Sequence, residues 1–229
     1  MKTIGLIGGM SWESSLEYYR IINEVVKHRL GGTHSARSIM YSVNFEEIEK
    51  LQNSGDWDRL TTIMTDAALS LEKAGADIIV ICTNTMHKAA DKIQEKVSIP
   101  MLHIVDPTAK RIKSVGISKI GLLGTKFTME QDFFKGRLIE KHGLEIILPD
   151  ENERKVIHDI IYSELVLGEI KEESREKFKL IISNLKRKGA EGVILGCTEI
   201  GLLIKKEDVE IPIFDTTELH AIAAVDFAL

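Results

Sequence analysis

The chain has 229 residues, of which 44% are hydrophobic and 28% charged, a composition typical of soluble globular proteins with a full hydrophobic core. Its net charge of −5, with both signs mixed along the chain, argues against nucleic acid or an anionic membrane as a partner. No segment approaches the roughly 20 consecutive apolar residues of a membrane span, and two cysteines without zinc-type spacing suit a reducing cytoplasm.

Short apolar runs alternate with segments of helical periodicity along the whole chain. Ser11 and Asp106 are predicted helix N-caps, and Thr128 with Gln131 forms a capping-box signal. The expected strands cover residues 4–7, 39–43, 77–82, 99–104, 119–125, 144–148, 192–196 and 211–215. The expected helices cover residues 12–30, 56–74, 88–96, 132–142, 154–167 and 172–188, with two more beginning near 106 and 217. This alternation predicts parallel α/β units.

The second half of the chain repeats the first. Three short strings recur in the same order at offsets of 116, 114 and 112 residues, and they pair Gly5 with Gly121, Gly75 with Gly189, and Pro100 with Pro212. Such an internal duplication predicts two pseudo-equivalent α/β lobes that face one another. We expect residues 1–100 plus 213–229 to form the first lobe, and 101–212 the second, with the active site in the cleft between them.

The repeat aligns Cys197 with Thr83 and not with the other cysteine. The offset of 114 residues places Thr83 on Cys197, and Cys82 on Gly196. Because ligands of parallel sheets bind beyond the carboxyl ends of the strands, Thr83 and Cys197 are expected to face one ligand from two sides. Neighbouring strand residues point in opposite directions, so Cys82 is expected to face the packing helices.

Two groups on opposite faces of a small molecule suit removal of a proton from one face and its return to the other. That reaction is racemisation or epimerisation at a carbon beside a carboxylate, and a cysteine thiolate is a suitable base. We expect the helix that follows Cys197 to lower the pKa of this thiol through its N-terminal N–H groups. Further polar or cleft-lining side chains near the same strand ends are expected to bind substrate: Met10, Asn84, Thr85 and Thr198.

Each of these residues also has a structural interpretation. Cys197 could be a small buried hydrophobe, Met10 a core residue, and His87 a structural histidine in place of one that orients the site. His103 and His220 lack clustered acidic or cysteine partners, so no metal site is predicted. The turn after the first strand lacks the Gly-x-Gly-x-x-Gly and Gly-Lys-Ser/Thr patterns of nucleotide-phosphate loops.

Four motifs together resemble the cofactor-independent aspartate/glutamate racemase superfamily, and most closely its aspartate racemase branch. They are the Gly-Leu-Ile-Gly-Gly-Met string at residues 5–10, Asn-Thr-x-His at 84–87, Gly-Cys-Thr-Glu at 196–199, and the two Ile-Pro strands. The resemblance implies two Rossmann-like lobes related by pseudo-twofold symmetry, often in homodimers. It also implies a two-base mechanism, with a cysteine from each lobe beside the substrate α-carbon and neither pyridoxal phosphate nor metal.

The chain departs from that family pattern at the first cysteine. The family usually has cysteine before the Asn-Thr-x-His motif, where this chain has Thr83. It shares the string Cys-Thr-Asn-Thr-Met-His with racemases described as specific for L-aspartate and L-glutamate. A threonine hydroxyl is a poor base, so the resemblance implies Cys197 as the base toward the L-amino acid and Thr83 as the proton donor on the other face.

The substrate class follows from the resemblance, with aspartate or glutamate as the first expectation. Glu199 of the family motif is expected to bind substrate as well, and Gln52, with Lys50 nearby, could bind the distal carboxylate. Two alternatives stay open. A related hydantoin racemase, maleate isomerase or decarboxylase would keep the fold and change the reaction, and a non-catalytic amino-acid-binding protein would keep only the cleft.

Overall fold

The computed structural model describes residues 1–229, which form two compact α/β units. The first unit comprises residues 1–104 and 220–229, and the second comprises residues 105–219. None of the helices combines the length and the apolar composition that crossing a lipid bilayer requires.

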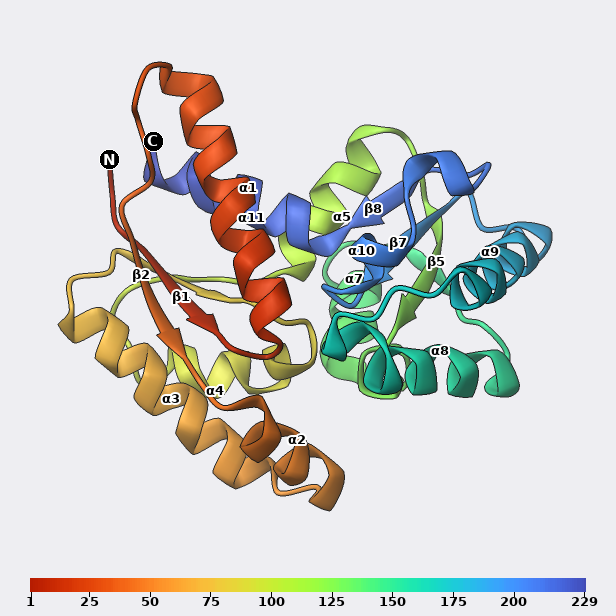
Figure 1. Cartoon of the computed structure of the whole chain (residues 1–229), viewed down its shortest axis with the longest axis horizontal. Coiled ribbons are helices and arrows are strands. Elements are labelled where there is room, and N and C mark those ends of the chain that lie inside the picture. Colours follow the sequence, from red (N-terminus) through yellow and green to blue (C-terminus); the bar gives the residue numbers. More distant parts are fainter. The chain divides into compact units, whose positions relative to one another are not determined.

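The first unit contains one parallel four-stranded sheet in the order β2-β1-β3-β4. Its elements are β1 (Ile4–Gly8), α1 (Trp12–Leu30), β2 (Ser38–Ser42), α2 (Phe45–Ser54), α3 (Trp57–Lys73), β3 (Ile78–Ile81), the 3₁₀ helix η1 (Thr85–Ala89), α4 (Ala90–Gln94) and β4 (Met101–Leu102). The end of α11 (Thr216–Ala228) completes it. In Figure 1, α1 and α11 lie on one side of this sheet, and α2, α3 and α4 on the other.

Both faces of the first sheet are buried, which explains why its strands read as continuous apolar runs. Ile78, Val80 and Cys82 pack with α1 and α11 in one cluster, whereas Ile79 and Ile81 pack with α2, α3 and α4 in another. This alternation has the period of two that a strand requires. It places Cys82 against α1 and α11, in agreement with the predicted helix packing of this side chain.

The second unit repeats the topology of the first with the strand order β6-β5-β7-β8, again all parallel. Its elements are α5 (Val105–Ser114), β5 (Lys119–Gly124), α6 (Lys126–Glu130), α7 (Asp132–Glu140), β6 (Glu145–Ile147), α8 (Glu151–Ser163), η2 (Leu165–Leu167), α9 (Glu172–Arg187), β7 (Gly192–Gly196), α10 (Ile200–Leu203), η3 (Lys206–Asp208), β8 (Ile213–Asp215) and the start of α11. The matching strand orders agree with the internal repeat, and the predicted α/β class with two parallel sheets is confirmed.

The unit boundaries differ from the predicted ones by a few residues. Residues 213–219 lie in the second unit, because β8 forms hydrogen bonds with β7. Residues 101–104 lie in the first, because β4 pairs with β3.

Helix capping follows the sequence at some positions and departs from it at others. Ser11 caps α1, and its side chain accepts a hydrogen bond from the Ser14 N–H. The predicted cap at Thr128 is wrong, because Thr125 begins α6 one turn earlier and leaves Thr128 buried inside that helix. The helix predicted to start at Asp106 already includes Val105, and the Asp106 carboxylate binds Arg137 at 2.7 and 2.8 Å.

Gly196 ends β7 at a position where the sheet leaves no space for a side chain. A Cβ atom there would lie 2.6 Å from the Leu123 carbonyl oxygen of the neighbouring strand. We therefore expect Gly196→Ala to lower the free energy of unfolding by about 1–3 kcal/mol, measured by urea denaturation. Gly121→Ala is the matched control in β5, since the tightest contact of its Cβ would be the Leu185 side chain, at 3.0 Å from Cδ1, while the nearest backbone atom, the Gly192 carbonyl oxygen, lies at 3.5 Å. If Gly196→Ala lowered the free energy of unfolding no more than Gly121→Ala, the conclusion that the sheet leaves no space for a side chain at Gly196 would be wrong.

Candidate active site

In the first unit, the chain leaves β3 through Cys82 and Thr83. Cys82 is completely buried, and this burial raises the pKa of its thiol far above the usual range. Thr83 is half-buried. The Ile104 N–H donates to His87 Nε2 at 3.2 Å, so the other ring nitrogen carries the proton and donates to the Thr83 carbonyl oxygen at 2.8 Å. His87 thus fixes the backbone of Thr83, and Cys82 is unsuited to act as an acid or base.

The other predicted substrate-binding residues of the first unit are mostly buried beside this strand end. Asn84 and Thr85 begin the 3₁₀ helix η1 and are 2% and 4% exposed. Gln52 lies on α2, and its Nε2 contacts the Met86 sulfur at 3.4 Å. Met10 is part of the core cluster that also contains Ile7, which accords with its structural interpretation.

In the second unit, the chain leaves β7 through the predicted catalytic cysteine. Cys197 is 7% exposed, and its Sγ donates a hydrogen bond to Glu199 Oε2 over 2.9 Å. The Thr198 hydroxyl donates to the same oxygen at 2.8 Å. Three consecutive residues of the family motif therefore form one hydrogen-bonded group, with the Glu199 carboxylate as the shared acceptor.

This arrangement reverses the expected direction of the Cys197 pKa. Burial raises the pKa of the thiol well above its usual value, and the negative charge of Glu199 raises it further. The backbone N–H groups of Glu199 and Thr198 do lower this pKa, as predicted, but the two opposing effects are larger. The raised pKa favours the protonated thiol, which donates its hydrogen bond to Glu199.

Lys50, considered from the sequence as a possible ligand of a distal carboxylate, is bonded elsewhere. Its Nζ lies 2.7 Å from Glu46 on the exposed side of α2, where the two residues form an i,i+4 ion pair. The 3₁₀ helix η2 before Gly168 is Leu-Val-Leu and contains no cationic side chain.

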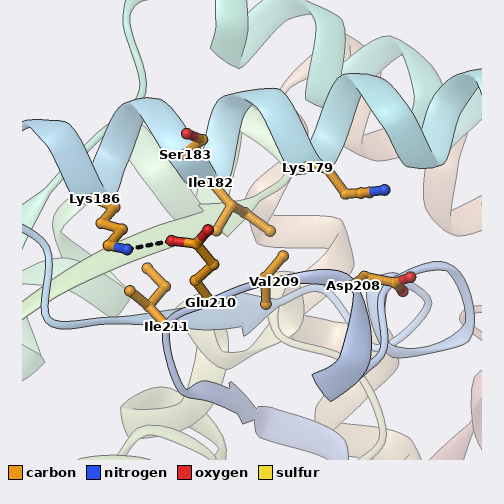
Figure 2. Close-up of a pocket in the computed structure, with 8 residues that line it drawn as sticks. All are labelled: Lys179, Ile182, Ser183, Lys186, Asp208, Val209, Glu210 and Ile211. Carbon is orange, nitrogen blue, oxygen red and sulfur yellow. Dashed lines mark hydrogen bonds and ion pairs between the residues drawn. The ribbon is translucent and has the colours of Figure 1, made fainter.

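A groove in the second unit lies away from these residues. It runs between α9 and the segment that leads to β8, and Figure 2 shows Lys186 and Glu210 joined across it. This segment approaches the amino end of β8, whereas ligands of parallel sheets bind at the carboxyl ends. No predicted site residue lines the groove, so it gives no support to a catalytic role.

The two matching parallel sheets, each with polar side chains beyond the carboxyl end of an inner strand, define a class of duplicated α/β proteins. The chain belongs to the Asp/Glu/hydantoin racemase family, whose model matches residues 7–224.

Several solved structures and one curated relative are similar to the chain over most of its length. A candidate Asp/Glu racemase from Yersinia pestis is 56% identical with a TM-score of 0.92, and the match covers 100% of this chain and 99% of that one. An aspartate racemase homologue from Pyrococcus horikoshii OT3 is 39% identical with a TM-score of 0.86 at the same coverage. The broad specificity amino-acid racemase RacX of Bacillus subtilis (strain 168) is 27% identical over 170 residues, which are 74% of this chain and 73% of that protein.

Proposed function

We propose that this protein is a cofactor-independent isomerase that interconverts the L- and D-forms of aspartate or glutamate. Cys197 would exchange the α-proton on one face of the substrate and Thr83 on the other. The observation that carries the proposal is the hydrogen bond from the Cys197 thiol to the Glu199 carboxylate, at the carboxyl end of an inner strand. Family membership supports racemisation as the reaction.

The reaction from the L-enantiomer begins with the thiol of Cys197. Its proton passes to the Glu199 carboxylate, which already accepts the S–H hydrogen bond. The resulting thiolate removes the α-proton and becomes a thiol again, and the electron pair of the C–H bond remains on the substrate as a carbanion. The Thr83 hydroxyl then donates a proton to the opposite face and regains one from solvent, while the Glu199 proton returns to solvent.

Thr83 makes this mechanism unequal on its two faces. A hydroxyl donates a proton to a carbanion more readily than it removes one from carbon, because the threonine alkoxide is a very strong base that is hardly populated near neutral pH. Enantiomers have equal free energies, however, so a poor base on one face slows net racemisation in both directions. We therefore expect slow turnover, with α-proton exchange from L-aspartate faster than inversion.

The remaining side chains would hold the substrate. Asn84, Thr85 and Thr198 offer short polar groups near the two strand ends, and Met10 and Gln52 would line the space for the side chain of the amino acid.

The protein would act in the cytoplasm as a homodimer. Family membership supports the homodimer. Two cysteines without zinc-type spacing support a reducing compartment such as the cytoplasm.

Incorporation of solvent deuterium at the α-carbon tests the proposal. L- and D-aspartate and L- and D-glutamate are incubated separately in deuterated buffer, and NMR follows loss of the α-proton while chiral chromatography follows inversion. We expect exchange with the L-enantiomer in the wild type and in Thr83→Ala, with inversion lost only in the variant. Binding of amino acids detected by thermal shift, without any exchange, would identify a non-catalytic binding protein instead. Exchange confined to hydantoins, or turnover of maleate, would identify the related isomerases.

A further inference from the structure

A lysine leaves the second sheet at the same edge as the proposed catalytic thiol. Strands β5 and β7 are parallel neighbours, and Gly124 at the end of one pairs with Gly196 at the end of the other. Cys197 follows Gly196 directly, and Lys126 follows Gly124 after a single intervening residue. Neighbouring strands lie about 4.8 Å apart. A ligand held at Cys197 would therefore be within reach of the long Lys126 side chain.

The internal repeat assigns Lys126 to a position already associated with the site. The offset of 116 residues that aligns Gly121 with Gly5 places Lys126 on Met10. Met10 is the residue after the turn that closes β1, where it packs in the core cluster with Ile7 and where the sequence also predicts a cleft-lining residue. The second unit therefore carries a cation at the position where the first carries an apolar side chain.

The charge of Lys126 is not neutralised within the protein. Its side chain is exposed and forms no ion pair, whereas Lys119 and Lys155 each bind a carboxylate oxygen at 2.6–2.7 Å. The nearest aromatic ring to its ammonium group is Phe127, with Nζ 5.3 Å from the ring centroid. The Lys126 N–H donates to His158 Nδ1 at 3.4 Å. The positive charge of Lys126 also acts on the His158 ring. The pKa of His158 is lowered mainly by burial and next by this charge.

We propose that Lys126 binds the side-chain carboxylate of a dicarboxylic amino acid. This inference rests on the proposed function and adds to it the group that selects acidic substrates. It also supplies the cation that Lys50 and the apolar segment before Gly168 do not provide. A lysine ammonium group on a flexible four-carbon stem can follow carboxylates at different depths, so both aspartate and glutamate should be accepted.

The test compares substrates with and without the second carboxylate. Values of kcat/KM for α-proton exchange are measured with L-aspartate, L-glutamate and L-asparagine in the wild type, Lys126→Met and Lys126→Arg. Removing a charge-assisted hydrogen bond is expected to lower the values for aspartate and glutamate about 10- to 100-fold in Lys126→Met. Asparagine should change less than about threefold, and Lys126→Arg should keep most of the preference for acidic substrates. Lys110→Met, which removes another exposed lysine without an ion pair from the same unit, serves as the control.

A change that is equal for aspartate and asparagine would overturn the role of Lys126 and leave the proposed function intact. Thermal unfolding with and without succinate, a dicarboxylate that lacks the α-ammonium group, provides a readout independent of catalysis. We expect succinate to raise the Tm of the wild type and of Lys110→Met more than that of Lys126→Met. If the wild type exchanges no amino acid, the proposed function fails. The Tm shifts with succinate then decide alone whether Lys126 binds a carboxylate. A wild type that neither exchanges an amino acid nor responds to succinate overturns both.

Discussion

Replacing Cys197 by alanine is expected to lower kcat for α-proton exchange with L-aspartate by about 10²- to 10⁴-fold, the usual contribution of a positioned acid or base. The variant loses the thiol that we propose as the base for the α-proton, while Glu199 and Thr198 keep their own hydrogen bond. NMR in deuterated buffer measures the rate directly. Exchange in the variant within tenfold of the wild-type rate would exclude Cys197 as the base.

Cys82→Ala provides the matched control, because it removes the other thiol of the chain. Cys82 is completely buried among α1 and α11, so its loss should lower the free energy of unfolding by about 1–2 kcal/mol and leave the exchange rate per folded molecule unchanged. Activity is therefore normalised to the folded fraction. Loss of exchange in a folded Cys82→Ala variant would show that the strand register inferred from the repeat is wrong.

Acid is expected to destabilise the protein through His220, which is fully buried in the first unit. Its Nε2–H donates to the Leu102 carbonyl oxygen at 2.9 Å, and its Nδ1 accepts from the Tyr18 hydroxyl at 2.8 Å, so both nitrogens are occupied in the neutral form. Burial lowers the pKa of His220 to about 3, with a further contribution from His87. An unfolded histidine titrates near 6.5.

The direction of the pH effect follows from these two pKa values. Between pH 6.5 and 3 the unfolded chain binds a proton at His220 that the folded chain does not, so stability falls as the pH falls. The loss is about 1.4 kcal/mol per pH unit, and at most about 5 kcal/mol over the whole interval. It is absent above pH 6.5, where the imidazole is neutral in both states.

Urea unfolding of the wild type and of His220→Phe between pH 4 and 7.5 isolates this contribution. The variant loses the two hydrogen bonds at every pH, so its overall stability should be lower, but its decline toward acid should be shallower. Tyr18→Phe removes one hydrogen bond and keeps the imidazole, and should retain much of the wild-type slope. Parallel slopes in the wild type and His220→Phe would show that His220 does not titrate in this range.

Much of the fold could be predicted because its signals are local. The inner strands β1, β3, β5 and β7 are short apolar runs that end at polar or glycine-containing turns, and each lies inside or within one residue of its predicted range. The alternation of strand side chains predicts that Cys82 and Thr83 point in opposite directions. The burial of Cys82 against α1 and α11 agrees with this prediction. Helix α2 was not expected, because its segment is mostly polar and buries only Ile48 and Gln52.

The sequence by itself determined the family, the duplicated α/β fold and the alignment of Cys197 with Thr83, since these depend on residue order, periodicity and motif. Only the tertiary structure decided the chemical state of Cys197, because its pKa depends on burial and on the distance to the Glu199 carboxylate. It likewise showed that Lys50 is paired with Glu46 and that Lys126 makes no ion pair. Charge pairing and desolvation arise from distances between side chains in the folded molecule, and spacing along the chain does not fix those distances.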